Sequence, residues 1–186
     1  ARTPASKAAE SSAVKPSKTP DFSVVVPVFN EEGAAPDLAR EIAAAFKGRA
    51  FEIIFVDDAS KDATRAALAA LKGEIPQLRV LSHRKNSGQS RAVRTGVIAA
   101  RAPIIATLDG DGQNDPADAP RLTDRLAAAP QTLGLIGGER VKRQDSYSKK
   151  YASKIANAAR RAMLNDQTND AGCGLKVFRR DAFLLL

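Results

Sequence analysis

The chain has 186 residues, 44% of them hydrophobic, which is enough for one soluble globular domain with a sizeable core. Its single cysteine, Cys173, excludes an intramolecular disulfide and fits a reducing compartment. The net charge of +8 gathers in residues 1–20 and 139–161, whereas residues 21–138 are nearly neutral, so we expect no nucleic-acid partner.

The first twenty residues are rich in Ala, Ser, Pro and Lys, and they predict a disordered leader (1–20) before a folded domain (21–186). Apolar runs of β type then alternate with helical patterns. We expect strands over residues 22–28, 51–57, 78–83, 103–109 and 132–138. We expect helices over residues 36–47, 62–72, 87–101 and 116–129. Because strands with few polar residues are buried on both faces, this order predicts a Rossmann-like α/β/α sandwich around a mostly parallel sheet.

The two ends of the chain bear on its location. No apolar run approaches the ~20 residues of a transmembrane helix, and the N-terminus lacks the apolar segment of a signal peptide. The chain ends in "DAFLLL", within what the pattern indicates is a regular element. We therefore expect a C-terminal continuation, which could carry a membrane anchor.

Polar segments follow four of the expected strands. They are "FNEE" (29–32), "DDAS" (57–60), "RKNSG" (84–88) and "DGDGQND" (109–115). In open parallel sheets, ligands bind beyond the carboxyl ends of the strands. We therefore expect the ligand-binding side chains in these segments.

The last of these segments places oxygen-bearing side chains at every second position, namely Asp109, Asp111 and Gln113. Hard divalent cations prefer oxygen ligands, and Mg²⁺ is commonly held by one or two carboxylates together with substrate phosphates. Gly110 and Gly112 permit the tight backbone that two converging carboxylates require. An ordinary Asp-Gly turn is an alternative explanation of the segment 109–115. The Gly and Glu spacing of an EF-hand calcium loop is not met.

A second carboxylate pair, Asp57 and Asp58, ends the second strand. An acid at this place in a nucleotide-binding α/β fold accepts hydrogen bonds from a base or ribose, although a helix cap by Ser60 or Asp62 is the plainer explanation. No G-x-G-x-x-G follows the first strand and no P-loop motif occurs, which disfavours dinucleotide and P-loop sites. The only histidine, His83, ends a strand and is expected to be packed or capping rather than catalytic.

Five motifs occur in a fixed order: "VVVPVFNEE" (24–32), "IIFVDDASKDAT" (53–64), "NSGQSRAVRTG" (86–96), "IATLDGDGQNDP" (105–116) and "GCGLKVFRR" (172–180). Together, over residues 22–180, they resemble the family 2 inverting glycosyltransferases of the GT-A fold. They are most similar to dolichol- and polyprenyl-phosphate sugar synthases. The match covers nearly all of the expected domain, which makes the set far more specific than any single motif.

The resemblance implies a role for each matching residue. It implies a nucleotide pocket lined by Pro27, Phe29 and Glu31, with Asp58 on the base. It implies that Asp109 and Asp111 lie at the sugar diphosphate, where Asp111, Gln113 and Asp109 bind Mg²⁺ or Mn²⁺. It also implies phosphate contacts from Arg140 and from Lys149, with Arg140 joining the two aspartates in catalysis. The expected donor is a UDP- or GDP-sugar, and the sequence does not decide between them.

The basic segment 139–161 carries eight basic and two acidic residues, and from Ser146 to Leu164 it predicts an amphipathic helix. Its polar stripe consists of Lys150, Lys154, Asn157 and Arg161. A solvated face explains such a stripe, but so does contact with anionic headgroups. We expect a cytoplasmic protein that is peripheral at the inner face of the membrane.

A missing group agrees with the acceptor that the resemblance implies. Transfer to a hydroxyl needs a general base, and no further carboxylate is clearly placed for that task. A polyprenyl phosphate needs none, because a phosphate monoester is already anionic at neutral pH. The first hypothesis is thus metal-dependent transfer to polyprenyl phosphate. The alternatives are transfer to a saccharide or protein hydroxyl, and a catalytically silent nucleotide-binding module that docks at membranes.

Overall fold

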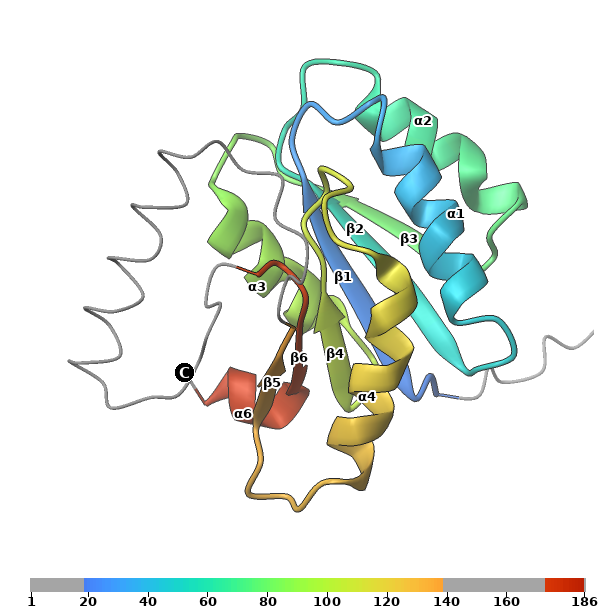
Figure 1. The fold of residues 1–186 in the computed structure, drawn as a ribbon. Coiled ribbons are helices and arrows are strands. Elements are labelled where there is room, and N and C mark those ends of the chain that lie inside the picture. The colour runs from blue at the N-terminus through green and yellow to red at the C-terminus, as the bar shows by residue number, and fades with distance from the viewer. Residues whose placement is uncertain (1–18, 139–172, 186) are drawn as a thin grey trace, which may run out of the picture.

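The computed structural model of the chain describes residues 19–138 and 173–185 (Figure 1). Six strands form one sheet in the order β3-β2-β1-β4-β6-β5. Their bounds are β1 Phe22–Val28, β2 Phe51–Asp57, β3 Leu78–Ser82, β4 Ile104–Thr107, β5 Leu135–Gly137 and β6 Lys176–Arg179. The strands β3, β2, β1 and β4 are parallel, while β6 runs antiparallel to both of its neighbours. The prediction of a mostly parallel sheet is confirmed.

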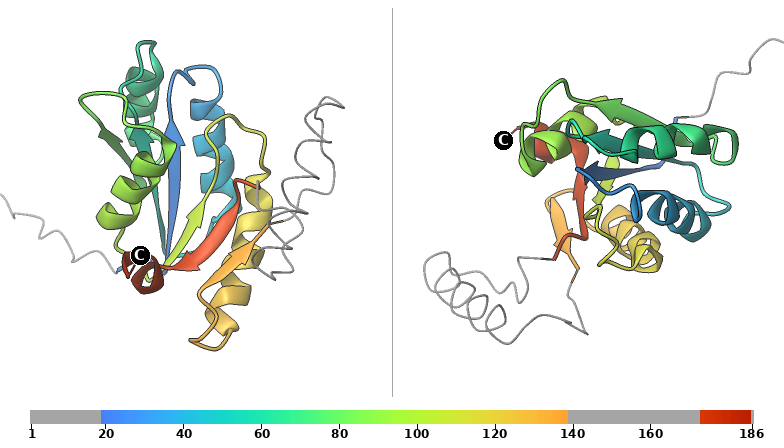
Figure 2. Two further views of the ribbon diagram at one scale, coloured as in Figure 1. Left: turned by 90° about the vertical axis from the view of Figure 1, so that its left-hand side faces the viewer. Right: turned by 90° about the horizontal axis from the view of Figure 1, so that it is seen from above.

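Helices cover both faces of this sheet (Figures 1 and 2). They are α1 Ala35–Ala45, α2 Thr64–Ala70, α3 Gln89–Ala99, α4 Ala119–Ala128 and α6 Arg180–Leu184, with short 3₁₀ turns η1 Leu71–Gly73 and η2 Pro116–Asp118. Helices α1, α2 and α4 pack on one face, and α3 and α6 lie on the other. The predicted α/β/α layering is therefore confirmed. None of the helices in the described ranges is long and apolar enough to cross a membrane.

The two cores follow from the alternation of side chains along each strand. On β1, Val24 and Val26 join the larger core under α1 and α4, while Val25 joins the smaller core under α3. All three valines are fully buried, as expected for a strand covered on both faces. A central strand without polar side chains in its middle thus separates the two layers of helices.

The observed strand bounds agree best with the predicted ones at β1 and β2. Strands β1 and β2 have the predicted bounds, but β4 ends at Thr107, two residues earlier than predicted. The chain leaves the sheet there, so Asp109 is free to turn toward the ligand edge. Strand β6 was not predicted, because four residues with Lys and Arg at their ends carry no clear strand period, whereas helix α6 lies where the C-terminal pattern indicated a regular element without specifying its type. Residues 1–18 of the expected leader (1–20) and the helix expected over 146–164 lie outside the described residues.

Two consecutive arginines fasten the end of β6 to helices on opposite faces. The Arg179 guanidinium is buried and donates to the carbonyls of Leu126 and Ala129 at the end of α4, at 3.0 and 2.9 Å. Arg180 donates to the carbonyls of Val97 and Ile98 at the end of α3, at 3.1 and 3.0 Å. Cations at helix C-termini satisfy unpaired carbonyls and the helix dipole. The "RR" of the fifth motif is therefore structural.

Candidate functional site

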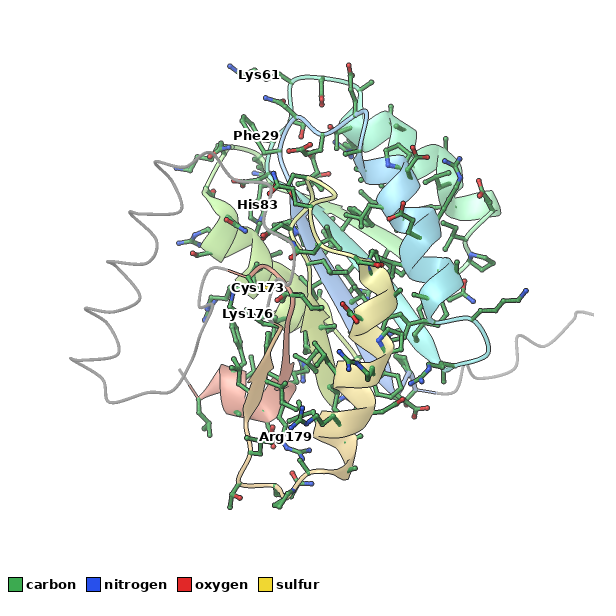
Figure 3. All side chains as sticks on the ribbon, in the orientation of Figure 1. Phe29, Lys61, His83, Cys173, Lys176 and Arg179 are labelled. Atoms are coloured by element: carbon green, nitrogen blue, oxygen red, sulfur yellow. The ribbon has the colours of Figure 1, made fainter. Side chains whose placement is uncertain are left out.

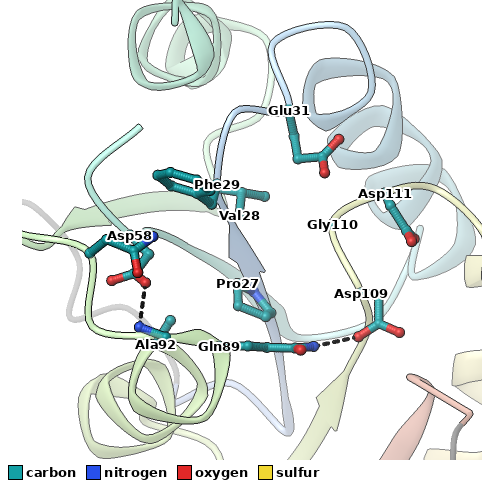
Figure 4. A pocket seen from close by; sticks show the side chains of 12 residues that line it. Pro27, Val28, Phe29, Glu31, Asp58, Gln89, Ala92, Asp109, Gly110 and Asp111 are labelled. Carbon is teal, nitrogen blue, oxygen red and sulfur yellow. Dashed lines mark hydrogen bonds between the residues drawn. The ribbon is translucent and has the colours of Figure 1, made fainter. Parts of the chain in front are cut away.

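A cleft of about 380 Å³ opens where β1 and β4 end side by side. From β1 the chain proceeds to β2 on one side, and it returns through α3 to β4 on the other. This is the topological switch point at which open α/β sheets bind ligands. Six residues singled out in the sequence line the cleft, namely Pro27, Phe29, Glu31, Asp58, Asp109 and Asp111 (Figure 4).

The acidic loop after β4 passes close to the end of β1. A Cβ atom on Gly110 would lie 2.6 Å from the Pro27 carbonyl oxygen, so only glycine allows this approach. The side chain of Asp111 accepts a hydrogen bond from the backbone N–H of Gln113 at 3.1 Å, which closes a turn inside the loop. Gln113 itself is exposed and does not line the cleft. Its expected role as a metal ligand stays a prediction.

The carboxylate of Asp109 is held by groups from distant parts of the chain. Gln89, the first residue of α3, donates its amide N–H to one oxygen at 2.8 Å (Figure 4). Asn114 reaches the other oxygen with a longer contact of 3.5 Å. Gly174, just before β6, lies so close that a Cβ there would be 2.0 Å from the same oxygen. The orientation of Asp109 is thus set by α3, by its own loop and by the entry into β6.

Asp58 organises the loop between β3 and α3. Its oxygens accept from the backbone N–H groups of Ser87, at 2.9 and 3.0 Å, and Gly88, at 2.7 Å, and pair with His83 Nδ1 at 2.6 Å. Burial raises the pKa of Asp58, but the hydrogen bonds from His83, Ser87 and Gly88 outweigh it and hold that pKa below its ordinary value. His83 is bound on its other side to Thr95, at 2.9 Å from Nε2. It therefore links Asp58 to α3 through hydrogen bonds.

The loop that carries Phe29 and Glu31 is tied to the loop after β2. Three of its backbone N–H groups donate to side chains there, in the pairs Asn30 to Ser60, Glu31 to Thr64 and Glu32 to Asp62, at 2.9, 2.8 and 3.1 Å. Asp62 also accepts from the Thr64 N–H at the start of α2, which confirms a capping role for it. These bonds fix one wall of the cleft before any ligand binds.

The electrostatics of the cleft favour a cation. Burial raises the pKa of Glu31, and the negative charges of Asp111 and Asp62 raise it further. Within residues 19–138 and 173–185, no three or more potential metal-ligating acids, histidines or cysteines form a closed cluster. The carboxylates that are present fit a cation held by one or two of them together with oxygens of a bound ligand, which is the usual manner of Mg²⁺.

Sequence reasoning missed three residues of the site, and the structure does not describe two of the residues that it assigned. Arg140 and Lys149 fall outside the described residues, so their expected phosphate contacts stay predictions. Gln89, Asn114 and Gly174 were not assigned a role, although all three stand within recognised motifs. Motif spacing indicated the segments, but only the fold shows that they meet at Asp109.

Comparison with known proteins bears on this site. A model described as "Glycosyl transferase family 2" matches residues 23–185. The chain is 37% identical over 170 residues to an undecaprenyl-phosphate 4-deoxy-4-formamido-L-arabinose transferase of Pseudomonas aeruginosa, covering 90% of this chain and 49% of that protein. It is 37% identical over 168 residues to a dodecaprenyl-phosphate galacturonate synthase of Rhizobium johnstonii, covering 88% and 49%. The chain thus spans about half the length of these relatives.

Solved structures share the fold. A mannosyltransferase from Pyrobaculum calidifontis, in complex with GDP-Man and Mn²⁺, superposes with a TM-score of 0.65 at 22% identity, covering 93% of this chain and 48% of that one. Glucosyl-3-phosphoglycerate synthase from Mycobacterium tuberculosis, with Mn²⁺, UDP and phosphoglyceric acid, gives 0.68 at 22% identity, covering 87% and 56%.

Proposed function

Because the chain belongs to glycosyl transferase family 2 and has the GT-A fold, we propose that it transfers a sugar from a nucleotide-sugar to a polyprenyl phosphate. The observation that carries this is the cleft at the switch point, which Glu31, Asp109 and Asp111 line beside a preformed loop. The acceptor class is supported by relatives 37% identical to the chain, whose names specify polyprenyl phosphates. The donor is a UDP- or GDP-sugar, the two nucleotides seen in the solved relatives.

The nucleotide would lie along the wall formed by Pro27, Phe29 and Asp58. Phe29 is 40% exposed, so a base can stack on its ring without displacing core residues. Asp58 is 3% exposed and already accepts hydrogen bonds on both oxygens. We therefore infer that it acts on the nucleotide mainly by holding the loop 83–88, whose Asn86 and Gly88 line the cleft. Its direct contact with the base stays a prediction.

A divalent cation, Mg²⁺ or Mn²⁺, would be held by Asp111, with Asp109 and Gln113 as the further predicted ligands. It would offset the charge that grows on the departing nucleoside diphosphate. The raised pKa of Glu31, caused by burial and then by Asp111, supports this, because a cation would relieve the repulsion between the two side chains. Asp109 is oriented by Gln89 and can contact the sugar at the same time.

The transfer is a single displacement. An anionic oxygen of the acceptor phosphate attacks the anomeric carbon and forms the new carbon–oxygen bond. The bond from that carbon to the diphosphate oxygen breaks, and its electron pair leaves with the nucleoside diphosphate. No proton has to be removed, because the attacking oxygen is already ionised. Attack from the face opposite the leaving group gives inversion, and the protein contributes mainly alignment and charge stabilisation.

The membrane surface is the proposed location of the acceptor. Residues 139–161 carry eight basic and two acidic side chains, and each Lys or Arg at an anionic surface contributes about 1 kcal/mol. The segment includes Arg140 and Lys149, the predicted phosphate contacts, which would face the acceptor headgroup. A peripheral position at the inner leaflet is consistent with this charge.

The test is a transfer assay with radiolabelled nucleotide-sugars, Mn²⁺, and either undecaprenyl phosphate or undecaprenol as acceptor. We expect transfer to the phosphate alone. Transfer to the alcohol alone would refute the proposal, since it requires a general base. Asp111→Asn should abolish Mn²⁺-dependent nucleotide binding with little change in Tm, because the residue is exposed in a loop. Asp118→Asn, an exposed acid just beyond that loop in η2, is the matched control and should behave as the wild type.

A further inference from the structure

A second and larger cavity, of about 630 Å³, adjoins the nucleotide cleft. The two share Pro27, Gln89 and Asp109, so the second cavity is continuous with the point where the sugar would lie. Its volume is within the range of small-molecule sites. We call it the side groove.

The floor of the side groove is the sheet face that α3 leaves uncovered. Helix α3 packs on β1 and β2, and the groove extends beyond it over β4, β6 and β5. Along β6 the side chains alternate. Lys176 and Phe178 point to the groove, whereas Val177 enters the opposite core and Arg179 binds α4. Figure 3 shows Lys176 beside Cys173 at the upper end of this strand and Arg179 at its lower end.

The walls of the groove are apolar. Val93 comes from α3, and Phe183 comes from α6. The Phe183 ring stacks on Phe178 with centroids 5.1 Å apart and an angle of 20° between the planes. Leu135 of β5 completes the far side and is 54% exposed. A ligand in this position would therefore contact aliphatic and aromatic side chains along most of its length.

The end nearest the cleft is polar. Asp109, Gln89 and Ser90 lie there, and Lys176 is the only cation among the described residues that line the groove. The Lys176 ammonium donates one hydrogen bond to the Cys173 carbonyl at 2.5 Å. An ammonium has three N–H groups, so two remain for a ligand. The groove thus offers a fixed positive charge at one end and an apolar surface at the other.

We propose that the side groove binds the acceptor, with its phosphate at Lys176 and its first isoprene units on Val93, Phe178 and Phe183. This rests on the proposed function and assigns its acceptor to a surface. A ligand with an anionic head and an apolar chain matches both ends of the groove, whereas a saccharide would leave the apolar walls unused. Continuity with the cleft at Asp109 brings the head to the sugar while the chain stays outside the nucleotide site.

The test is calorimetric binding of farnesyl phosphate and of dimethylallyl phosphate, which differ in the number of isoprene units. The wild type should bind farnesyl phosphate more tightly. The double variant Val93→Gln, Phe183→Gln should lose on the order of tenfold in affinity for farnesyl phosphate and bind the two ligands nearly alike. Lys176→Gln should weaken both ligands by a similar factor, because it acts on the shared phosphate. Nucleotide affinity should be unchanged in all of these variants.

The matched control is Ile98→Gln, an exposed apolar residue of the same helix outside the groove, which should leave both affinities unchanged. If the double variant melts early, Lys176→Gln carries the test. The assignment of the acceptor to the side groove is refuted if farnesyl phosphate does not bind the wild type, or if the wild type and the variants bind it equally. Transfer to undecaprenyl phosphate without groove-dependent binding leaves the proposed function standing. Groove-dependent binding without any transfer supports the groove as a binding site and refutes the proposed function.

Discussion

Replacing Gly174 by alanine probes the support of the key carboxylate without touching a charged group. The added Cβ would lie 2.0 Å from one oxygen of Asp109, 2.3 Å from its carboxyl carbon and 2.8 Å from the Asn114 amide nitrogen. Carbon contacts are most favourable at about 3.5 Å. The Asp109 side chain or the start of β6 must therefore move by roughly 1 Å or more.

The size of the expected loss in activity follows from the contacts that hold Asp109. A shift of that size breaks or lengthens the 2.8 Å hydrogen bond from Gln89 and turns the carboxylate away from the proposed sugar position. Misplacing a reacting group by about 1 Å costs on the order of 10²-fold in rate. Overpacking of this kind lowers the free energy of unfolding by about 1–3 kcal/mol. For a domain of this size each kcal/mol shifts Tm by about 2–4 °C.

The assay is kcat/KM for transfer to undecaprenyl phosphate, measured well below the Tm of the variant. We expect Gly174→Ala to lose about 10²-fold in kcat/KM while its circular dichroism spectrum stays native. Gly137→Ala is the control, because Gly137 lies on the adjacent strand and a Cβ there meets nothing within 4 Å. Wild-type kinetics in Gly174→Ala would show that Asp109 needs no such support, and would refute the reasoning.

Three further outcomes follow from other contacts. Gln89→Ala should lower kcat by more than it changes the donor KM, whereas Gln89→Glu, which brings a like charge to Asp109, should be worse than alanine in steady-state assays. Asp58→Ala should weaken UDP or GDP binding by about 1–3 kcal/mol and lower Tm as well, since it releases the loop 83–88; calorimetry that shows unchanged affinity would contradict both roles given to it. Glu52→Gln should cost about 1.5–3 kcal/mol in urea unfolding, because Glu52 is 1% exposed and accepts from Ser23, Arg79 and Arg101. Burial raises the pKa of Glu52, yet these hydrogen bonds hold that pKa below the ordinary 4.5. The stabilisation from Glu52 is therefore present above pH 4.5 and is lost as the pH falls through the lower folded-state pKa. This pH dependence should be missing from the stability profile of Glu52→Gln.

The parallel part of the sheet could be predicted from local pattern. The segments "FSVVVPV" and "FEIIFVD" are largely apolar and lead into the segments 29–32 and 57–60, and they became β1 and β2 with the expected bounds. A strand buried on both faces needs such a run, so its position is encoded within a few residues. The same logic placed Asp58, Asp109 and Asp111 at one edge, because parallel strands end together. These three residues do line one cleft.

The pairing of β6 was decided only by the tertiary structure. Its four residues lie antiparallel between β4 and β5, and their register brings Lys176 opposite Thr107. That pairing puts Gly174 under Asp109 and Lys176 at the end of the side groove. Nothing in a four-residue stretch specifies a partner so far away along the chain. The choice rests on contacts such as those of Arg179 and Arg180 with the ends of α4 and α3.

The same division separates the two sets of site residues. The acidic side chains after the strands could be recognised from the sequence as candidate site residues. Carboxylates in turns at strand ends mostly either cap helices or bind ligands. In the sequence, Gln89 and Asn114 look like ordinary polar residues. Their role depends on hydrogen bonds to Asp109, which form only once α3 and the loop after β4 have packed. Local sequence determined which chemistry stands at the ligand edge. Long-range packing, which carries no periodic signal, decided how those groups are held.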